Sequence, residues 1–272
     1  MSTRRLIVNA DDFGFTHDVN RGIVEAHRSG ILTATTLMAT GAAFDDAVRL
    51  AHEHPTLDVG CHLVLVNAQS ALDSGRALPA TVAELLGAMV ARRIAVYDEL
   101  RAQVDRIVAA GIRPSHLDTH KHTHLAPPVL DAVARISRET GIRWVRRPFD
   151  FPLTAGKIPW TKRAVSRGLT VVRNRFHRVL SAHGCLSTDH FAGFQMTGRF
   201  RTAELVELIE GLPEGLTEFM THPGFCTDEL RGARTRLKES RERELQALTA
   251  AETRDALARR GVELTNYRSQ PA

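Results

Sequence analysis

Short apolar runs alternate with amphipathic segments along most of the chain. The first run, residues 4–10, ends at Asp11 and Asp12, and residues 17–29 then repeat apolar side chains at helical spacing. Strand-like runs follow at residues 33–39, 57–63 and 114–118, and helical segments follow at residues 43–53, 98–110 and 126–140. Because strands that alternate with helices form parallel sheets covered by those helices, this order predicts an α/β fold.

The second half of the chain continues this order with two interruptions. Strand-like runs lie at residues 144–147, 189–191, 216–220 and 262–266, and helical segments lie at residues 202–210 and 239–260. Residues 66–97, with a capping box from Thr81 to Glu84, and the basic residues 157–183 break the alternation. Since we find no repeat and no interdomain linker, we expect one catalytic domain over residues 1–272, with 66–97 and 157–183 as insertions near the mouth of a barrel.

Composition narrows the class of protein. The chain has 272 residues, a formal net charge of +5 and three widely spaced cysteines, which argue against a disulfide framework and for a reducing compartment. Its N-terminus becomes charged too early for a signal peptide, and its apolar runs are too short for a membrane span. We therefore expect a cytoplasmic protein, with peripheral contact to the inner membrane face as a further possibility.

Polar side chains follow several of the predicted strands. Asp11 and Asp12 end the first strand, His62 lies in the third, and His222 follows the run at residues 216–220. Four of the 13 histidines, His116, His120, His122 and His124, lie with Asp118 at the end of the fourth strand and directly after it. Because the carboxyl ends of parallel strands meet at one edge of a sheet, we expect these groups to lie around one mouth.

The histidine cluster favours a metal site, because clustered imidazoles repel one another once they are protonated. One carboxylate and two imidazoles leave coordination positions open for water and substrate, as catalytic sites require. Asp12, His62 and histidines of the cluster can supply such a set, while Asp11 can accept a proton from water. The chain turns within the cluster, so not all four histidines can bind one ion.

Taken together, these motifs resemble the YdjC-like carbohydrate deacetylase family. The stretches that carry the resemblance are Asn9-Ala10-Asp11-Asp12-Phe13-Gly14, Gly60-Cys61-His62-Leu63, the run from His116 to His124, and Thr221-His222-Pro223-Gly224. That family is similar to the NodB-type polysaccharide deacetylases. The resemblance implies a distorted TIM-like (β/α) barrel and hydrolysis of a linear amide bond, with release of acetate from an N-acetylated amino sugar.

The resemblance also assigns roles to residues. It implies one divalent metal ion, zinc or magnesium, bound by Asp12, His62 and His120, with His124 as the second choice for the third ligand. Asp11 would be the general base and His222 the general acid. The remaining positions would support these groups or face the substrate: His116, Asp118, His122, His124 and Phe13, near which a backbone N–H would hold the oxyanion.

Residues 61–72 resemble a narrower branch associated with hopanoid biosynthesis. This resemblance implies an N-acetylglucosaminyl hopanoid, N-acetylglucosaminyl bacteriohopanetetrol, as the substrate. Residues 157–183 carry seven basic residues and no acid, with apolar side chains at helical spacing. Such a helix can lie on an anionic membrane, or it can pack its apolar face on the barrel and solvate its charges.

The sequence is compatible with other functions as well. Soluble chitooligosaccharides are alternative substrates, and a metal-dependent phosphoesterase is an alternative enzyme, because barrels host many reactions. A metal-dependent lectin would leave Asp11 and His222 without a role. We expect no nucleic-acid partner, because only Trp160 and Phe176 interleave with the basic residues of the 157–183 segment.

Overall fold

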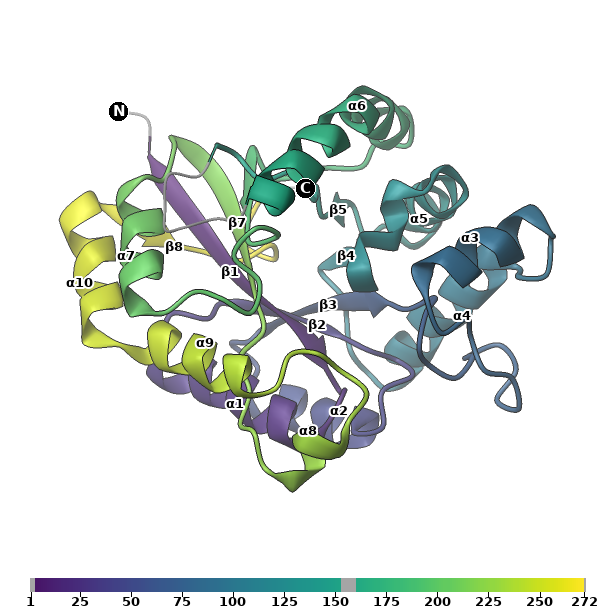
Figure 1. Ribbon diagram of the computed structural model, residues 1–272, viewed down its shortest axis with the longest axis horizontal. Helices are drawn as coiled ribbons and strands as arrows, with labels where there is room; N and C mark the ends of the chain where they lie inside the picture. The colour runs from purple at the N-terminus through teal and green to yellow at the C-terminus, as the bar shows by residue number, and fades with distance from the viewer. Residues whose placement is uncertain (1–2, 153–159, 272) are drawn as a thin grey trace.

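A computed structural model describes residues 3–152 and 160–271 of the chain. Its centre is a parallel sheet with the strand order β5-β4-β3-β2-β1-β7-β6, and β8 pairs with the first residues of β1 (Figure 1). The strands are β1 Arg4–Phe13, β2 Ala34–Leu37, β3 Asp58–Leu63, β4 His116–Thr119, β5 Trp144–Val145, β6 His190–Ala192, β7 Gly215–Thr221 and β8 Val262–Leu264.

Two isolated bridges close the sheet into a distorted barrel. Trp144 pairs with Leu186, and Asp150 pairs with Phe191 in β6, so the chain spans the gap between the two edge strands. The Asp150 carboxylate reinforces this seam by accepting hydrogen bonds from the backbone N–H groups of Phe194 (3.1 Å) and Gln195 (2.9 Å). The predicted α/β fold of the distorted TIM-like barrel type is therefore confirmed.

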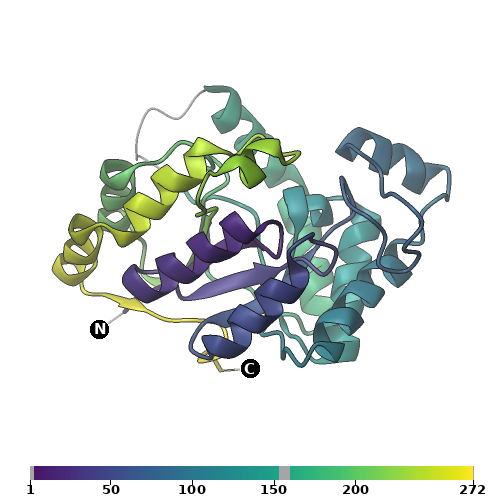
Figure 2. The ribbon, with the colours of Figure 1, turned by 90° about the horizontal axis from the view of Figure 1, so that it is seen from below.

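Helices surround the sheet, and α1 packs between α2 and α9 (Figure 2). The helices are α1 His17–Ser29, α2 Phe44–Glu53, α3 Val82–Val90, α4 Val96–Ala109, α5 Pro127–Thr140, α6 Trp160–Ala182, α7 Thr202–Glu210, α8 Asp228–Gly232, α9 Glu239–Thr249 and α10 Ala251–Arg260. Thr16 begins α1 because its hydroxyl accepts a hydrogen bond from the N–H of Val19 (3.2 Å). Among the described residues, no helix is long and apolar enough to cross a membrane.

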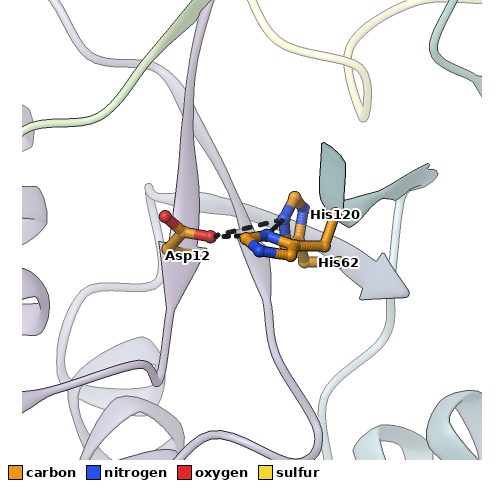
Figure 3. Close-up of side chains that lie close together, drawn as sticks. All are labelled: Asp12, His62 and His120. Atoms are coloured by element: carbon orange, nitrogen blue, oxygen red, sulfur yellow. Dashed lines mark hydrogen bonds and ion pairs between the residues drawn. The ribbon is translucent and has the colours of Figure 1, made fainter. Parts of the chain in front are cut away.

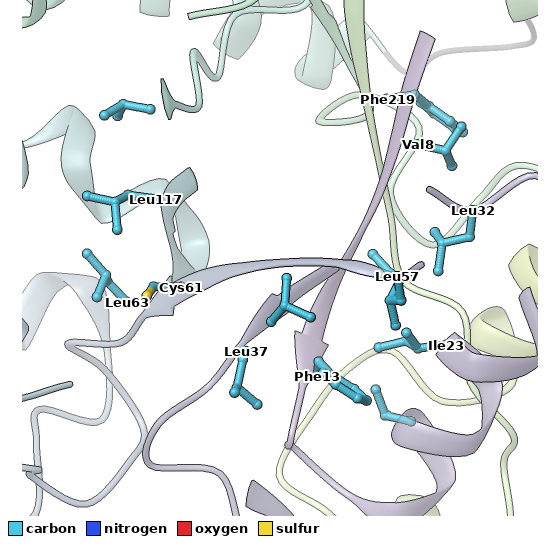
Figure 4. Packing of buried hydrophobic residues seen from close by; sticks show 14 of the residues in the cluster. Val8, Phe13, Ile23, Leu32, Leu37, Leu57, Cys61, Leu63, Leu117 and Phe219 are labelled. Carbon is cyan, nitrogen blue, oxygen red and sulfur yellow. The ribbon is translucent and has the colours of Figure 1, made fainter. Parts of the chain in front are cut away.

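The hydrophobic core lies between the sheet and the helices. Strand residues such as Val8, Leu37 and Leu117 pack there with Ile23 of α1 (Figure 4), and each of these four side chains is completely buried. The apolar spacing of the helices thus faces the sheet as the sequence pattern indicates.

Two segments differ in detail from the sequence pattern. The strand expected at 144–147 has only two residues, and the helical segment at 239–260 is divided at Ala250 into α9 and α10. Residues 120–125 form a 3-10 helix, so the histidine cluster turns after Thr119 as expected. In the basic segment, Lys157 lies outside the described residues, as do the side chains of Lys162, Arg163 and Arg167.

Candidate active site

A β-bulge allows two neighbouring acids to face the same cavity. Ala10 of β1 pairs with Thr35, but Phe13 pairs with Leu37, so β1 has one extra residue between these pairs. Asp12 lies in the bulge with a φ of 72°, and both Asp11 and Asp12 line the cavity. Without the bulge, adjacent side chains would point to opposite faces of the sheet. Phe13 points instead into the core (Figure 4), and its carbonyl accepts a hydrogen bond from the N–H of Met38 (2.7 Å).

Asp12, His62 and His120 form a compact triangle of ligand atoms. Asp12 Oδ1 lies 3.4 Å from His62 Nε2 and 3.2 Å from His120 Nδ1, and the two nitrogens are 3.2 Å apart (Figure 3). A tetrahedral ion with ligands at roughly 2.0–2.1 Å needs its ligand atoms about 3.3 Å apart. Asp12 Oδ1 is buried and has no hydrogen-bond partner among the described residues. The donor set therefore fits one divalent ion.

Buried partners orient two of these ligands from behind. Asp118 Oδ1 accepts a hydrogen bond from His62 Nδ1 (2.7 Å), which leaves Nε2 facing the triangle. Burial alone lowers the pKa of His62, but Asp118 and the neighbouring acids outweigh it and raise this pKa to about 10. Arg241 Nη2 lies 2.5 Å from Asp12 Oδ2. Burial raises the pKa of Asp12, yet Arg241 and the two histidines hold it well below its usual value, so the carboxylate stays charged.

The turn after β4 separates the histidines of the cluster. Lys121 and His122 adopt left-handed conformations with φ of 54° and 52°, and this turn directs His120 toward Asp12. His122 lines the cavity 5.7 Å from the Phe194 ring, measured between ring centroids. In His124, Nδ1 contacts Thr119 Oγ1 (2.5 Å) and Nε2 contacts the carbonyl of Arg146 (3.1 Å). Since both nitrogens of His124 are engaged, the geometry favours His120 as the third ligand.

Asp11 is held by a buried arginine. Arg146 Nη1 and Nη2 donate to the two carboxylate oxygens of Asp11 at 2.8 and 2.7 Å. The same guanidinium pairs with Asp118 (2.6 Å) and Glu218 (2.6 Å). Sequence reasoning missed Arg146, although it lies near the carboxyl end of the strand-like run at residues 144–147, which should reach the same mouth. A bidentate arginine fixes the plane of a carboxylate, so Asp11 has a defined orientation.

His222 lies on the other side of Asp11. Its Nε2 is 3.9 Å from Asp11 Oδ2, and its backbone N–H donates to Glu244 Oε2 (2.6 Å). Burial lowers the pKa of His222 to about 4, so its imidazole is neutral near pH 7. Arg241 and Glu244, which hold Asp12 and His222, were also missed, because a helix rich in charges is normally solvated. His116 lies beneath Asp11, away from the cavity, and contacts Asn9.

A cavity of about 440 Å³ opens above these groups. Partly buried Phe15 and Phe194 line it, and three basic residues from two segments line it as well: Lys121, Arg234 and Arg236. Asn67, from the expected insertion at 66–97, also lines the cavity and donates to the carbonyl of Arg234 (3.2 Å). This volume lies within the usual range for small-molecule sites, and the mouth is basic.

Known proteins resemble this chain over almost its whole length. The YdjC-like protein family matches residues 5–259. A carbohydrate deacetylase of Brevibacillus brevis is 33% identical over 271 residues, which cover 97% of this chain and 98% of the relative. A carbohydrate deacetylase of Vibrio parahaemolyticus is 30% identical over 268 residues, covering 97% and 95%.

A solved structure shows the same fold. The crystal structure of a putative cellobiose-phosphate cleavage protein from Enterococcus faecalis superposes with a TM-score of 0.77 at 24% identity, and the match covers 98% of this chain and 99% of the other. The family match spans all four clusters of site residues described above. This chain therefore belongs to the YdjC-like protein family.

Proposed function

We propose that this chain is a metal-dependent carbohydrate deacetylase that hydrolyses the acetamido group of an N-acetylglucosamine unit. The observation that carries the proposal is the triangle of Asp12, His62 and His120, which lies beside the fixed carboxylate of Asp11 in one cavity. The printed names of the relatives from B. brevis and V. parahaemolyticus support carbohydrate deacetylation as the reaction.

The donor set favours a single ion. Two imidazoles and one carboxylate suit zinc better than magnesium, which prefers oxygen ligands. A divalent ion held there would supply Lewis-acid catalysis by polarising the acetyl carbonyl and lowering the pKa of the attacking water. Among the described residues, a second candidate group joins Asp11, His62 and Asp118, but Arg146 already pairs with both of these acids. A second ion would have to displace this arginine.

Asp11 is the general base in this proposal. Arg146 fixes the orientation of its carboxylate, and its position in the bulge places it beside the Asp12 ligand. A water molecule that attacks the acetyl carbon loses its proton to Asp11 as the new C–O bond forms.

His222 is the general acid for the amine that leaves. Because burial holds its pKa at about 4, the imidazole is neutral before the reaction and must gain a proton during turnover. Asp11 Oδ2 lies 3.9 Å from His222 Nε2, so the proton taken from water can pass to His222 and then to the departing nitrogen. An amine leaves poorly without this protonation, so the transfer completes hydrolysis of the amide.

We also propose a lipid-linked substrate, N-acetylglucosaminyl hopanoid, on the resemblance of residues 61–72. Two surfaces support it. Large apolar side chains are exposed on and beside α3, namely Leu72, Val82, Leu86 and Val90, the last being 86% exposed. On α6, Arg173, Arg175 and Arg178 are exposed, whereas Phe176 and Leu180 pack into the core. Exposed apolar patches and cationic helices are both features of surfaces that contact lipid headgroups.

Acetate release tests the reaction and the substrate together. N-acetylglucosaminyl hopanoid in detergent and soluble diacetylchitobiose are each incubated with zinc or with EDTA, and Asp12→Ala serves as the matched inactive variant. We expect metal-dependent acetate from the lipid and little from the disaccharide. Acetate from the disaccharide alone would overturn the lipid substrate but keep the deacetylase mechanism.

The basic mouth keeps a phosphoesterase as the second candidate function. Lys121, Arg234 and Arg236 are placed where they could contact a phosphate group of a substrate. If neither acetylated compound releases acetate while the protein binds zinc, the deacetylase proposal is wrong. Release of inorganic phosphate from a sugar phosphate would then establish the phosphoesterase.

A further inference from the structure

A series of hydrogen bonds links Asp11 to buried residues on the side of Asp11 that faces away from the cavity. Asn9 Nδ2 donates to Asp11 Oδ1 (3.1 Å), and Asn9 Oδ1 contacts His116 Nε2 (3.0 Å). His116 Nδ1 in turn contacts the hydroxyl of Ser115 (2.8 Å). Asn9 and His116 are completely buried. These residues contact neither the ligand triangle nor the cavity, so the mechanism above does not use them.

The carboxylate sets the direction of the whole chain of hydrogen bonds. A charged carboxylate only accepts, so Asn9 must turn its NH₂ group toward Asp11 and its carbonyl oxygen toward His116. His116 must then carry its hydrogen on Nε2, and the hydroxyl of Ser115 donates to Nδ1. Burial lowers the pKa of His116 to about 4, which agrees with a neutral ring in one fixed tautomer.

The C-terminal segment holds His116 from below. Tyr267 stacks on the His116 ring with centroids 3.9 Å apart and planes 20° apart, and it is buried. The segment that carries Tyr267 is tied to the barrel, since the N–H of Thr265 donates to Leu6 (3.0 Å) and the N–H of Arg268 donates to Asp58 (3.0 Å). Tyr267 lies beyond residue 259, where the match to the YdjC-like family ends.

We propose that Asn9, His116 and Tyr267 are positioning residues that fix the catalytic base Asp11 from below. The proposal rests on the proposed function, because it takes Asp11 as the base. Arg146 orients Asp11 through two hydrogen bonds, but the same guanidinium also pairs with Asp118 and Glu218, so its own position depends on three acids. The Asn9 contact adds a third hydrogen bond to Asp11, and stacking by Tyr267 keeps His116 where it can hold Asn9.

The kinetic test separates positioning from folding. We expect Asn9→Ala to lower kcat about 10- to 100-fold, because displacing a catalytic group by ~1 Å can cost this much. KM and zinc content should stay within about two-fold, and the pH profile of kcat should shift. Tyr267→Leu, which keeps an apolar side chain but cannot stack, should lower kcat about 3- to 10-fold, and Tyr267→Phe should restore most of it. Arg268→Ala, in the same segment but outside the stack, is the control.

Each outcome decides a separate question. If Asp11→Asn abolishes turnover while Asn9→Ala and Tyr267→Leu keep wild-type kcat, the positioning proposal is wrong and the proposed function stands. If kcat, zinc content and the unfolding midpoint fall together in both variants, their role is structural and the proposal is again wrong. If Asp11→Asn keeps full turnover, the assignment of the base in the proposed function fails.

An independent readout needs no substrate. Proton–nitrogen NMR spectra of the imidazoles report the tautomer of His116, which we expect to be the Nε2–H form in the wild-type protein. Asn9→Ala should change this signature, and Arg268→Ala should not. A wild-type His116 with its hydrogen on Nδ1 would reverse the direction of the chain of hydrogen bonds and overturn the proposal.

Discussion

Asp11 and Asp12 are neighbours in the chain, and each pairs with a buried arginine, yet their surroundings differ. Arg146 contacts Asp11 through two nitrogens and occupies both carboxylate oxygens. Arg241 contacts only Oδ2 of Asp12, so Oδ1 keeps its lone pairs and faces two imidazoles. A general base needs a free lone pair and a fixed orientation, and Asp11 Oδ2, which accepts one hydrogen bond from Arg146, can provide both. Both residues carry the same carboxylate group, so the difference between their roles comes from the residues that contact them.

The two sides of the site also differ in what supports them. Behind the ligand side, Asp118 and Thr36 hold His62, and their contacts keep one imidazole nitrogen directed at the triangle. Behind the base side, Asn9 and Arg146 hold Asp11 directly. Variants on the ligand side should therefore change metal binding first, and variants on the base side should change turnover at constant metal content.

The largest effect is expected for Asp12→Ala. The change removes the only carboxylate of the triangle and leaves Arg241 without its buried partner, so zinc and activity should be lost together. Metal analysis of the purified protein and the acetate assay measure both losses. Stoichiometric zinc in an inactive Asp12→Ala protein would contradict the ligand assignment.

Asp11→Asn should distinguish the base side of the site from the ligand side most clearly. The amide keeps the shape of the side chain but cannot accept the proton from water, so kcat should fall about 10²- to 10⁴-fold. Zinc content should equal that of the wild-type protein, which metal analysis can show. If the zinc is lost as well, the contrast between the two acids is wrong.

Asp118→Asn should weaken zinc binding without removing a ligand. Loss of a carboxylate behind a metal-binding histidine typically costs 10- to 100-fold in metal affinity, and competition with a chelator measures this change. Thr36→Val, which removes only a hydroxyl group near His62 and Asp118, is the milder control. Unchanged affinity in Asp118→Asn would show that the negative charge of Asp118 behind His62 does not strengthen zinc binding.

The smallest expected effect is a loss of stability of the metal-free protein at acid pH. Burial lowers the pKa of both His116 and His124 to about 4, below the ordinary value near 6.5 of the unfolded chain. Between these values the unfolded state binds more protons, so acidification from pH 7 to 5 should reduce the free energy of unfolding by on the order of 1–2 kcal/mol for each histidine. His62 acts in the opposite sense, because its pKa is raised.

Urea titrations at the two pH values measure this dependence. His124→Gln should reduce the loss of stability between pH 7 and pH 5, because it removes one group that titrates. His52, whose side chain is exposed, serves as the matched control. Equal pH dependence in His124→Gln and in the wild-type protein would show that His124 does not contribute.

The sequence predicts the sheet and the residues at the strand ends. Apolar runs that alternate with amphipathic segments indicate a parallel sheet, and the ends of those runs show which residues lie at its carboxyl edge. Asp12, His62 and His120 meet because β1, β3 and β4 end at the same mouth. Choosing between His120 and His124 required the left-handed turn at Lys121, which residue spacing does not reveal.

The arginines of the site could not be found in the same way. Arg146 follows a strand of only two residues, and Arg241 lies in a helix whose charges resemble a solvated surface. A charged side chain is almost never completely buried unless it is paired, and the partners here are distant in sequence. The stack of Tyr267 on His116 joins residues 151 positions apart, so only the folded chain brings it together.

The extra residue in β1 also determines how the protein tolerates changes of chain length. A point substitution at residues 10–13 changes one side chain and leaves the orientation of the neighbouring side chains unchanged. Deletion of a single residue there would restore strict alternation, and one of the two carboxylates would then exchange places with a core residue such as Phe13. Homologous chains of this type should therefore keep the number of residues in the bulge as strictly as they keep its two acids.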